Sequence, residues 1–271
     1  MQNWKLTLTY DGTNYYGWQV QPGLPTIQGE LQAAIQRVLS SSWGEAPLPQ
    51  GSGRTDAGVH ALGQVASFEL GAPIPPENLQ RALNRTLPAA IRVLDAQIVH
   101  AAFHARHGAL AKTYEYRIFR GQLCSPFLAP YIHHCRWPLD FDAIQDAANA
   151  IIGEHDFLSL AASDPDLTLR GEEEPEGDTS IPTRSTIRTI FSSEWTESPG
   201  ELLVYRVRGN GFLHHMVRNL VGTMLEIGRG QFPAGSMPAI LAARSRSIAG
   251  PTAPARGLFL HSVEYPEESL L

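Results

Sequence analysis

A glycine-rich stretch, GSGRTDAGVH at residues 51–60, holds the side chains best suited to chemistry. Asp56 stands between Gly53 and Gly58, two residues after Arg54. The stretch is no dinucleotide-binding loop, because the third glycine of a GxGxxG motif would fall on Asp56, whose carboxylate would repel a pyrophosphate. It is no Walker A loop either, since no Lys-Ser or Lys-Thr pair follows. A carboxylate in this setting can act as a nucleophile or a general base, although an Asp in a glycine-rich loop can also simply hydrogen-bond its own turn.

Histidines offer a second possible chemistry, that of a metal site. Three of them follow the spacing i, i+4, i+7, which on a helix would place three ligands on one face: His100, His104 and His107. The strand pattern just before them argues against a helix, so we expect no metal there. Satisfied or surface side chains are the better interpretation of the adjacent pairs His133-His134 and His214-His215.

The formal net charge of −6 counts at first against a nucleic-acid partner. The charge is concentrated, however: residues 164–178 carry seven acids and one Arg, and the rest of the chain sums to zero. Residues 179–263 hold nine Arg and four acids, a net of +5. Nineteen of the 21 basic residues are Arg, the residue preferred for bidentate phosphate contacts and for stacking on bases. The balance of charge therefore leaves RNA open as a partner.

Composition sets the broad class of the protein. Hydrophobic content of 43% and charged content of 18% are typical of a globular chain with a buried core. We expect no membrane span, because no run of eighteen apolar residues occurs, and no signal peptide, because the N-terminus has no apolar core. The two cysteines are too few for a disulfide framework and predict reduced thiols in a cytoplasmic protein.

The elements that must position these residues follow from periodicity and from turn signals. Alternation predicts strands at 4–10, 64–70 and 113–119. Further strands are predicted at 91–99, 185–196, 201–209 and 257–265. Helical spacing predicts a helix from Ile27 to Leu39 capped by Thr26, one capped by Asp140 that runs to about Ile152, and others at 76–86, 212–227 and 236–246. The helix at 212–227 is expected to be amphipathic.

The order of the elements predicts an α+β fold of two similar halves, residues 1–106 and 107–271, joined near 101–112. The first half carries the Asp56 loop. An acidic stretch at about 161–181 interrupts the second half, and its Pro, Gly and Glu content is typical of a solvated loop.

Several blocks along the chain, in collinear order, are similar to one known family. GRTDAGVHALGQVASF resembles the catalytic motif of the TruA-type tRNA pseudouridine synthases. The further blocks that resemble this family are YDG with YYGWQ near the N-terminus, TIQGELQAAI at 26–35, FHAR at 103–106, KTYEYRI at 112–118, NGFLHHMVRNLVGTMLEIGRG at 210–230 and ARGLFLHSVEYP at 255–266.

The resemblance implies roles for four residues. Asp56 corresponds to the essential aspartate, and Arg218 to an arginine paired with it, although a phosphate contact or a surface charge is the alternative for Arg218. Tyr114, the first tyrosine of YxY, corresponds to the active-site tyrosine. Spacing alone does not choose between Tyr114 and Tyr116, since both share one strand face. Arg54 could fill the space that a flipped base leaves or hold a flanking phosphate, or it could be merely structural.

The resemblance also implies a fold and a substrate. The two halves would join their mostly antiparallel sheets into one extended sheet, with helices on one side and the active-site cleft between the halves. The enzyme would isomerise uridine to pseudouridine at positions 38, 39 and 40 of the tRNA anticodon stem-loop, as a homodimer without cofactor or metal. One departure is the sequence LSLAAS after Phe157, where relatives commonly have an arginine, and Arg184 and Arg188 are weak substitutes. The rival interpretation is an RNA-binding module without catalysis.

Overall fold

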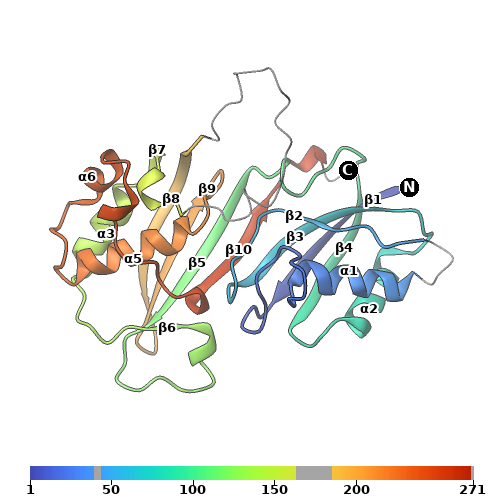
Figure 1. The fold of residues 1–271 in the computed structure, drawn as a ribbon, viewed down its shortest axis with the longest axis horizontal. Helices are drawn as coiled ribbons and strands as arrows, with labels where there is room; N and C mark the ends of the chain where they lie inside the picture. Colours follow the sequence, from blue (N-terminus) through green and yellow to red (C-terminus); the bar gives the residue numbers. More distant parts are fainter. Residues whose placement is uncertain (40–43, 163–184, 270–271) are drawn as a thin grey trace. The chain divides into compact units, whose positions relative to one another are not determined.

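The computed structural model describes residues 1–39, 44–162 and 185–269, which form ten strands and five α-helices. The fold is α+β, as predicted, and its sheet is mixed, with mostly antiparallel neighbours (Figure 1). The chain divides into two compact units: the first comprises Met1–Arg136, Thr196–Asn210 and Pro254–Leu271, and the second Trp137–Trp195 and Gly211–Ala253. This division differs from the boundary near residue 106. Whether the chain holds two pseudo-symmetric halves with a cleft between them stays a prediction.

The first unit is built on a sheet with the strand order β4-β1-β3-β10-β5-β9, in which β2 also pairs with β3 and β6 with β5. Neighbouring strands are antiparallel except in the pairs β10–β3 and β5–β6. The strands are β1 (Gln2–Tyr10), β2 (Gln50–Gly51), β3 (His60–Leu70), β4 (Ile91–Val99), β5 (Ala111–Phe119), β6 (His133–His134), β9 (Leu202–Gly209) and β10 (Leu258–Glu264).

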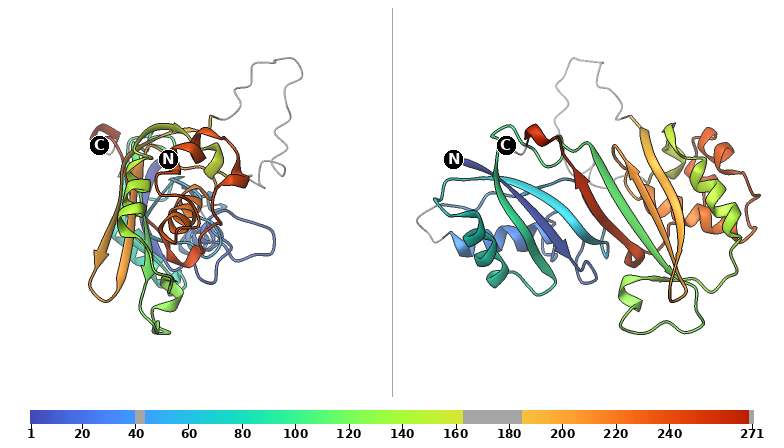
Figure 2. Two further views of the ribbon diagram at one scale, coloured as in Figure 1. Left: turned by 90° about the vertical axis from the view of Figure 1, so that its left-hand side faces the viewer. Right: turned by 180° about the vertical axis from the view of Figure 1, so that it is seen from behind.

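Two helices cover one face of this sheet, and the main hydrophobic core of the first unit lies on that face. Helix α1 (Ile27–Val38) begins where predicted, with the Thr26 side chain accepting a hydrogen bond from the Gly29 N–H. Helix α2 (Pro76–Thr86) has proline at its first turn, where the missing N–H costs nothing. Helix α2 packs on β4, and α1 packs beside α2 (Figure 2). The alternation of β1 buries the side chains that face this core, Trp4, Leu6, Leu8 and Tyr10.

The second unit contains α3 (Phe141–Asn149), β7 (Gly153–Asp156), α5 (Met216–Gly228) and α6 (Met237–Ala242). Its remaining strand, β8 (Ile187–Ser198), pairs antiparallel with β7 and ends within the first unit. Asp140 caps α3 as predicted, since its side chain accepts a hydrogen bond from the Ala143 N–H. The helix ends at Asn149 rather than near Ile152, because the chain turns into β7 through Gly153, whose φ is +105°.

Helix α5 differs from its prediction in two ways. It begins at Met216 instead of residue 212, because His215 takes a left-handed conformation with φ of 58° that a helix does not continue through. It is also buried all round rather than amphipathic, since every residue except Arg218 and Glu226 is buried. A Cβ on Gly222 would lie only 1.7 Å from the Pro251 carbonyl oxygen, so a loop packs directly against the backbone of the helix.

The other differences concern short or extended elements. Strand β3 starts at His60 rather than residue 64, because pairing with β1 and β10 extends it beyond its alternating part. The strands β2, β6 and β7 were not predicted, and α6 is shorter than the predicted 236–246. The acidic stretch 161–181 and Arg184 lie almost wholly outside the described residues. Within the described ranges, no helix is long and apolar enough to cross a membrane.

Candidate active site

Asp56 lies on the loop between β2 and β3, and the backbone of this loop is held by the segment after β1. The Trp18 N–H donates to the Thr55 carbonyl at 3.0 Å, and the Gly58 N–H donates to the Tyr15 carbonyl at 3.2 Å. A Cβ on Gly17 would stand 2.4 Å from the Thr55 carbonyl oxygen, so only glycine allows this approach. The segments YDG…GW and GRTDAGVH therefore form one backbone assembly around Asp56.

A buried polar network lies under the same loop. Gln64 of β3 is fully buried; its Oε1 accepts from the Ser52 hydroxyl at 2.7 Å, and its Nε2 donates to the Gly53 carbonyl at 2.9 Å. Tyr10 of β1 is hydrogen-bonded to the Thr55 hydroxyl at 2.8 Å. Burial raises the pKa of Tyr10 to about 12, so its phenol stays protonated at neutral pH.

The strand β5 presents Tyr114 to this loop. A Cβ on Gly53 would lie 3.8 Å from the Tyr114 hydroxyl oxygen. Burial raises the pKa of Tyr114, and electrostatic interactions with Tyr10 and Asp56 raise it further. Asp56 and Tyr114 thus interact electrostatically within one compact unit, with an uncharged phenol beside a carboxylate.

Tyr116, two residues on, has a different environment. It is completely buried, and its hydroxyl donates to the Pro254 carbonyl at 2.8 Å. A buried phenol with its hydroxyl bonded to the backbone is part of the core. Of the two tyrosines, Tyr114 is the one beside the Asp56 loop, and its role in the active site stays a prediction.

Lys112 also reaches the loop from β5. Its Nζ donates to the Ser52 carbonyl at 2.6 Å, and a Cβ on Gly53 would lie 3.4 Å from that nitrogen. A lysine cation is therefore fixed next to the loop that carries Asp56.

The two candidate arginines lie in different units. Arg54 is half-buried in the Asp56 loop. Arg218 lies in the first turn of α5, where its Nε donates to the Ala253 carbonyl at 2.8 Å and its own carbonyl accepts from the Ala253 N–H at 3.1 Å. These bonds fix the side chain relative to the second unit. Its pairing with Asp56 stays a prediction.

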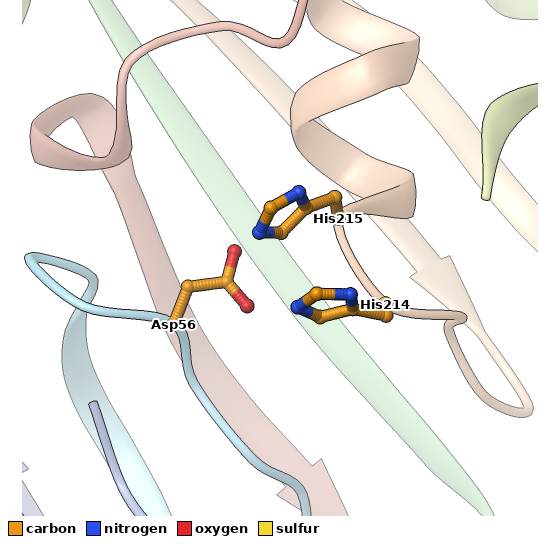
Figure 3. Close-up of side chains that lie close together, drawn as sticks. All are labelled: Asp56, His214 and His215. Carbon is orange, nitrogen blue, oxygen red and sulfur yellow. The ribbon is translucent and has the colours of Figure 1, made fainter. Parts of the chain in front are cut away.

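The histidines do not form the helical face that their spacing allowed. Residues 100–107 contain no helix, and the His104 ring instead accepts hydrogen bonds from the backbone N–H groups of Arg106 and His107. Figure 3 labels Asp56 on its loop and His214 and His215 on the segment that leads into α5. Within either unit taken alone, the described residues contain no cluster of three side chains able to share a metal ion.

Sequence reasoning missed three residues that support the loop: Ser52, Gln64 and Lys112. One sequence signal could have identified Gln64, because it is a polar side chain at the start of the strongly apolar run that forms a central strand. Lys112 had a weaker one, as one of only two lysines in the chain and on the same strand face as Tyr114.

Comparisons with known proteins define the class. A family model described as tRNA pseudouridine synthase matches residues 7–107 and 147–266, ranges that include Asp56 and Arg218, while Tyr114 lies between them. The chain belongs to the tRNA pseudouridine synthase family, whose enzymes are isomerases that act on uridine in tRNA.

Individual relatives match over almost their whole length. A tRNA pseudouridine synthase A from Solibacter usitatus (strain Ellin6076) is 52% identical over 98% of this chain and 100% of its own. A tRNA pseudouridine synthase A from Moorella thermoacetica (strain ATCC 39073 / JCM 9320) is 46% identical over 96% of this chain and 98% of its own.

Proposed function

We propose that this chain converts uridine to pseudouridine at positions 38, 39 and 40 in the anticodon stem-loop of tRNA, with Asp56 as the catalytic residue. The observation that carries the proposal is the arrangement of the Asp56 loop. It is held by backbone hydrogen bonds from one side and faces the protonated phenol of Tyr114 on the other. Full-length similarity to enzymes named tRNA pseudouridine synthase A supports the substrate.

The chemistry requires few groups. The N1–C1′ glycosidic bond breaks, the base turns, and a C5–C1′ bond forms while the C5 proton leaves and N1 gains a proton. There is no net oxidation or hydrolysis, so the reaction needs no cofactor and no metal. An ionised carboxylate serves as the nucleophile or the base. Asp56 fills this role, whether it attacks the base, attacks C1′ or removes a ribose proton.

The target base must first leave the RNA stack, which costs roughly a few kcal/mol. Stacking on an aromatic ring returns about 1–3 kcal/mol per base, and Tyr114 offers that ring. Arg54 fills the space that the flipped base leaves in the RNA stack, or it holds a flanking phosphate. Arg218 is the cation that pairs with the catalytic carboxylate of Asp56.

The remaining parts of the proposal concern the setting. The enzyme acts as a homodimer in the cytoplasm, with one tRNA touching both subunits. Arginines on the surface bind phosphates, so the affinity for tRNA should fall as salt concentration rises.

The proposal is tested by tritium release from tRNA labelled at uridine C5, with substrates that lack individual uridines at positions 38 to 40. We expect release that depends on the presence of these uridines. A protein that binds the tRNAs but releases no tritium is an RNA-binding module, which would overturn the proposal. Release that is unchanged when all three uridines are replaced would overturn the assigned positions.

A further inference from the structure

We infer that Gln64 is a positioning residue, whose buried amide fixes the Ser52–Thr55 turn so that Asp56 stands at the correct place for reaction. The inference rests on the proposed catalytic role of Asp56. It assigns to β3 a part in the reaction that is separate from binding the substrate.

The amide of Gln64 uses both of its ends. The Oε1 atom accepts from the Ser52 hydroxyl at 2.7 Å and from the Val65 N–H at 3.2 Å. The Nε2 atom donates to the Gly53 carbonyl at 2.9 Å and to the Tyr10 hydroxyl at 3.4 Å. Since the side chain is fully buried, water does not compete for these bonds.

Tyr10 extends the network to the residue before Asp56. Its oxygen accepts from the Gln64 amide, so its own hydrogen is available for the Thr55 hydroxyl at 2.8 Å. Because the pKa of Tyr10 is raised to about 12, this donor is not lost at any working pH. One amide thus holds Ser52 and Gly53 directly and Thr55 through Tyr10.

Only glutamine satisfies all of these partners. The Gly53 carbonyl requires a donor, and the Ser52 hydroxyl requires an acceptor, so an isosteric carboxylate would face a carbonyl oxygen without a hydrogen between them. A methionine of the same length would satisfy neither group. The other titratable side chains near this turn are Tyr10 on β1, Lys112 and Tyr114 on β5, Tyr265, which is hydrogen-bonded to the Ser52 side chain, and Arg54 and Asp56 of the loop itself.

The need for both a donor and an acceptor at Gln64 gives a test that distinguishes a positioning role from a purely structural one. In Gln64→Glu, the new carboxyl is ionised at high pH and cannot donate to the Gly53 carbonyl. Burial raises the pKa of such a group, so lowering the pH protonates it and restores one donor. The ratio of kcat for the variant to kcat for the wild type should therefore rise as pH falls from about 8 to about 6.

The experiment measures kcat from steady-state tritium release, together with tRNA affinity, for the full-length protein. At high pH we expect Gln64→Glu to lose about 100-fold in kcat, the effect of misplacing a reacting group by about 1 Å, with little change in affinity. Gln64→Met should show the loss without recovery at low pH. Gln97→Glu makes the same charge change at an exposed position of β4 and should leave kcat unchanged.

Three results separate the possibilities. A kcat for Gln64→Glu within about twofold of wild type at high pH overturns the inference. A loss of activity that matches a loss of thermal stability and shows no recovery at low pH also overturns it. Asp56→Asn is measured in parallel: if that variant stays active, the proposed catalytic residue is wrong, whereas an inactive Asp56→Asn beside a fully active Gln64→Glu removes only the role of Gln64.

Discussion

Two tyrosines on one face of β5 allow a matched test of which side chain meets the substrate. Tyr114 lies beside the Asp56 loop, and Tyr116 is bonded to the backbone in the core. Tyr114→Ala removes a ring proposed to stack on the flipped base, and Tyr116→Phe removes only a buried hydroxyl. Only Tyr114→Ala should therefore slow the reaction.

The expected magnitudes follow from these contacts. Loss of a stacked ring costs about 1–3 kcal/mol, which corresponds to about 5- to 150-fold in the rate of the isomerisation step. Loss of the 2.8 Å hydrogen bond from Tyr116 to Pro254 costs about 1 kcal/mol of folding free energy. Tyr114→Phe keeps the ring, so it should retain most of the activity that Tyr114→Ala loses.

The assay pairs single-turnover tritium release with urea unfolding for each variant. We expect Tyr114→Ala to be slow and also less stable, because the ring that it removes is buried, and Tyr116→Phe to be active but less stable. If Tyr116→Phe slows release as much as Tyr114→Ala without any loss of stability, the assignment of the two tyrosines is reversed.

Three further predictions concern charge and protonation. Burial lowers the pKa of His133 from 6.5 to about 4, so the unfolded chain binds a proton that the folded chain does not between these pH values. Unfolding free energy should fall by up to about 3 kcal/mol over this window as pH drops, and His133→Gln should flatten the curve. Glu115 is buried between Arg117 and Arg206, whose hydrogen bonds hold its pKa below its usual value despite burial. The stability it contributes should be present above about pH 4.5 and lost as pH falls through the lowered pKa, and urea unfolding of Glu115→Gln should lack that acid step. Deletion of 164–178 raises the net charge from −6 to zero and should leave tritium release intact, whereas a folded but inactive deletion variant would place that stretch in the active site.

Local sequence patterns predicted those helices and strands whose start and end signals lie within the element's own residues. The bounds of α2 and β4 were predicted correctly, and proline at the first turn marks the start of α2 in the sequence. The start of α5 was predicted wrongly, since it depends on the left-handed backbone of His215. The two-residue strand β6 forms only through pairing with β5, so no local period reveals it.

The candidate site likewise contains residues that the sequence predicted and residues that it did not. Asp56 and Tyr114 were selected from motifs, and both lie at the same loop of the first unit. The support from Gln64 and Lys112 could not be predicted, because it requires β3 and β5 to bring side chains distant in sequence to the Ser52–Gly53 turn. Long-range pairing of strands determines such contacts, and a single sequence does not encode it in any local window.

The role of Asp56 is tested most directly by single-turnover tritium release from C5-labelled tRNA with the wild type and Asp56→Asn, alongside the affinity of each for the tRNA. The substitution keeps the shape of the side chain and removes its charge. We predict unchanged binding and a rate reduced by about 100- to 10,000-fold, the usual contribution of a positioned acid or base. An Asp56→Asn variant that binds tRNA and releases tritium at the rate of the wild type would contradict the account.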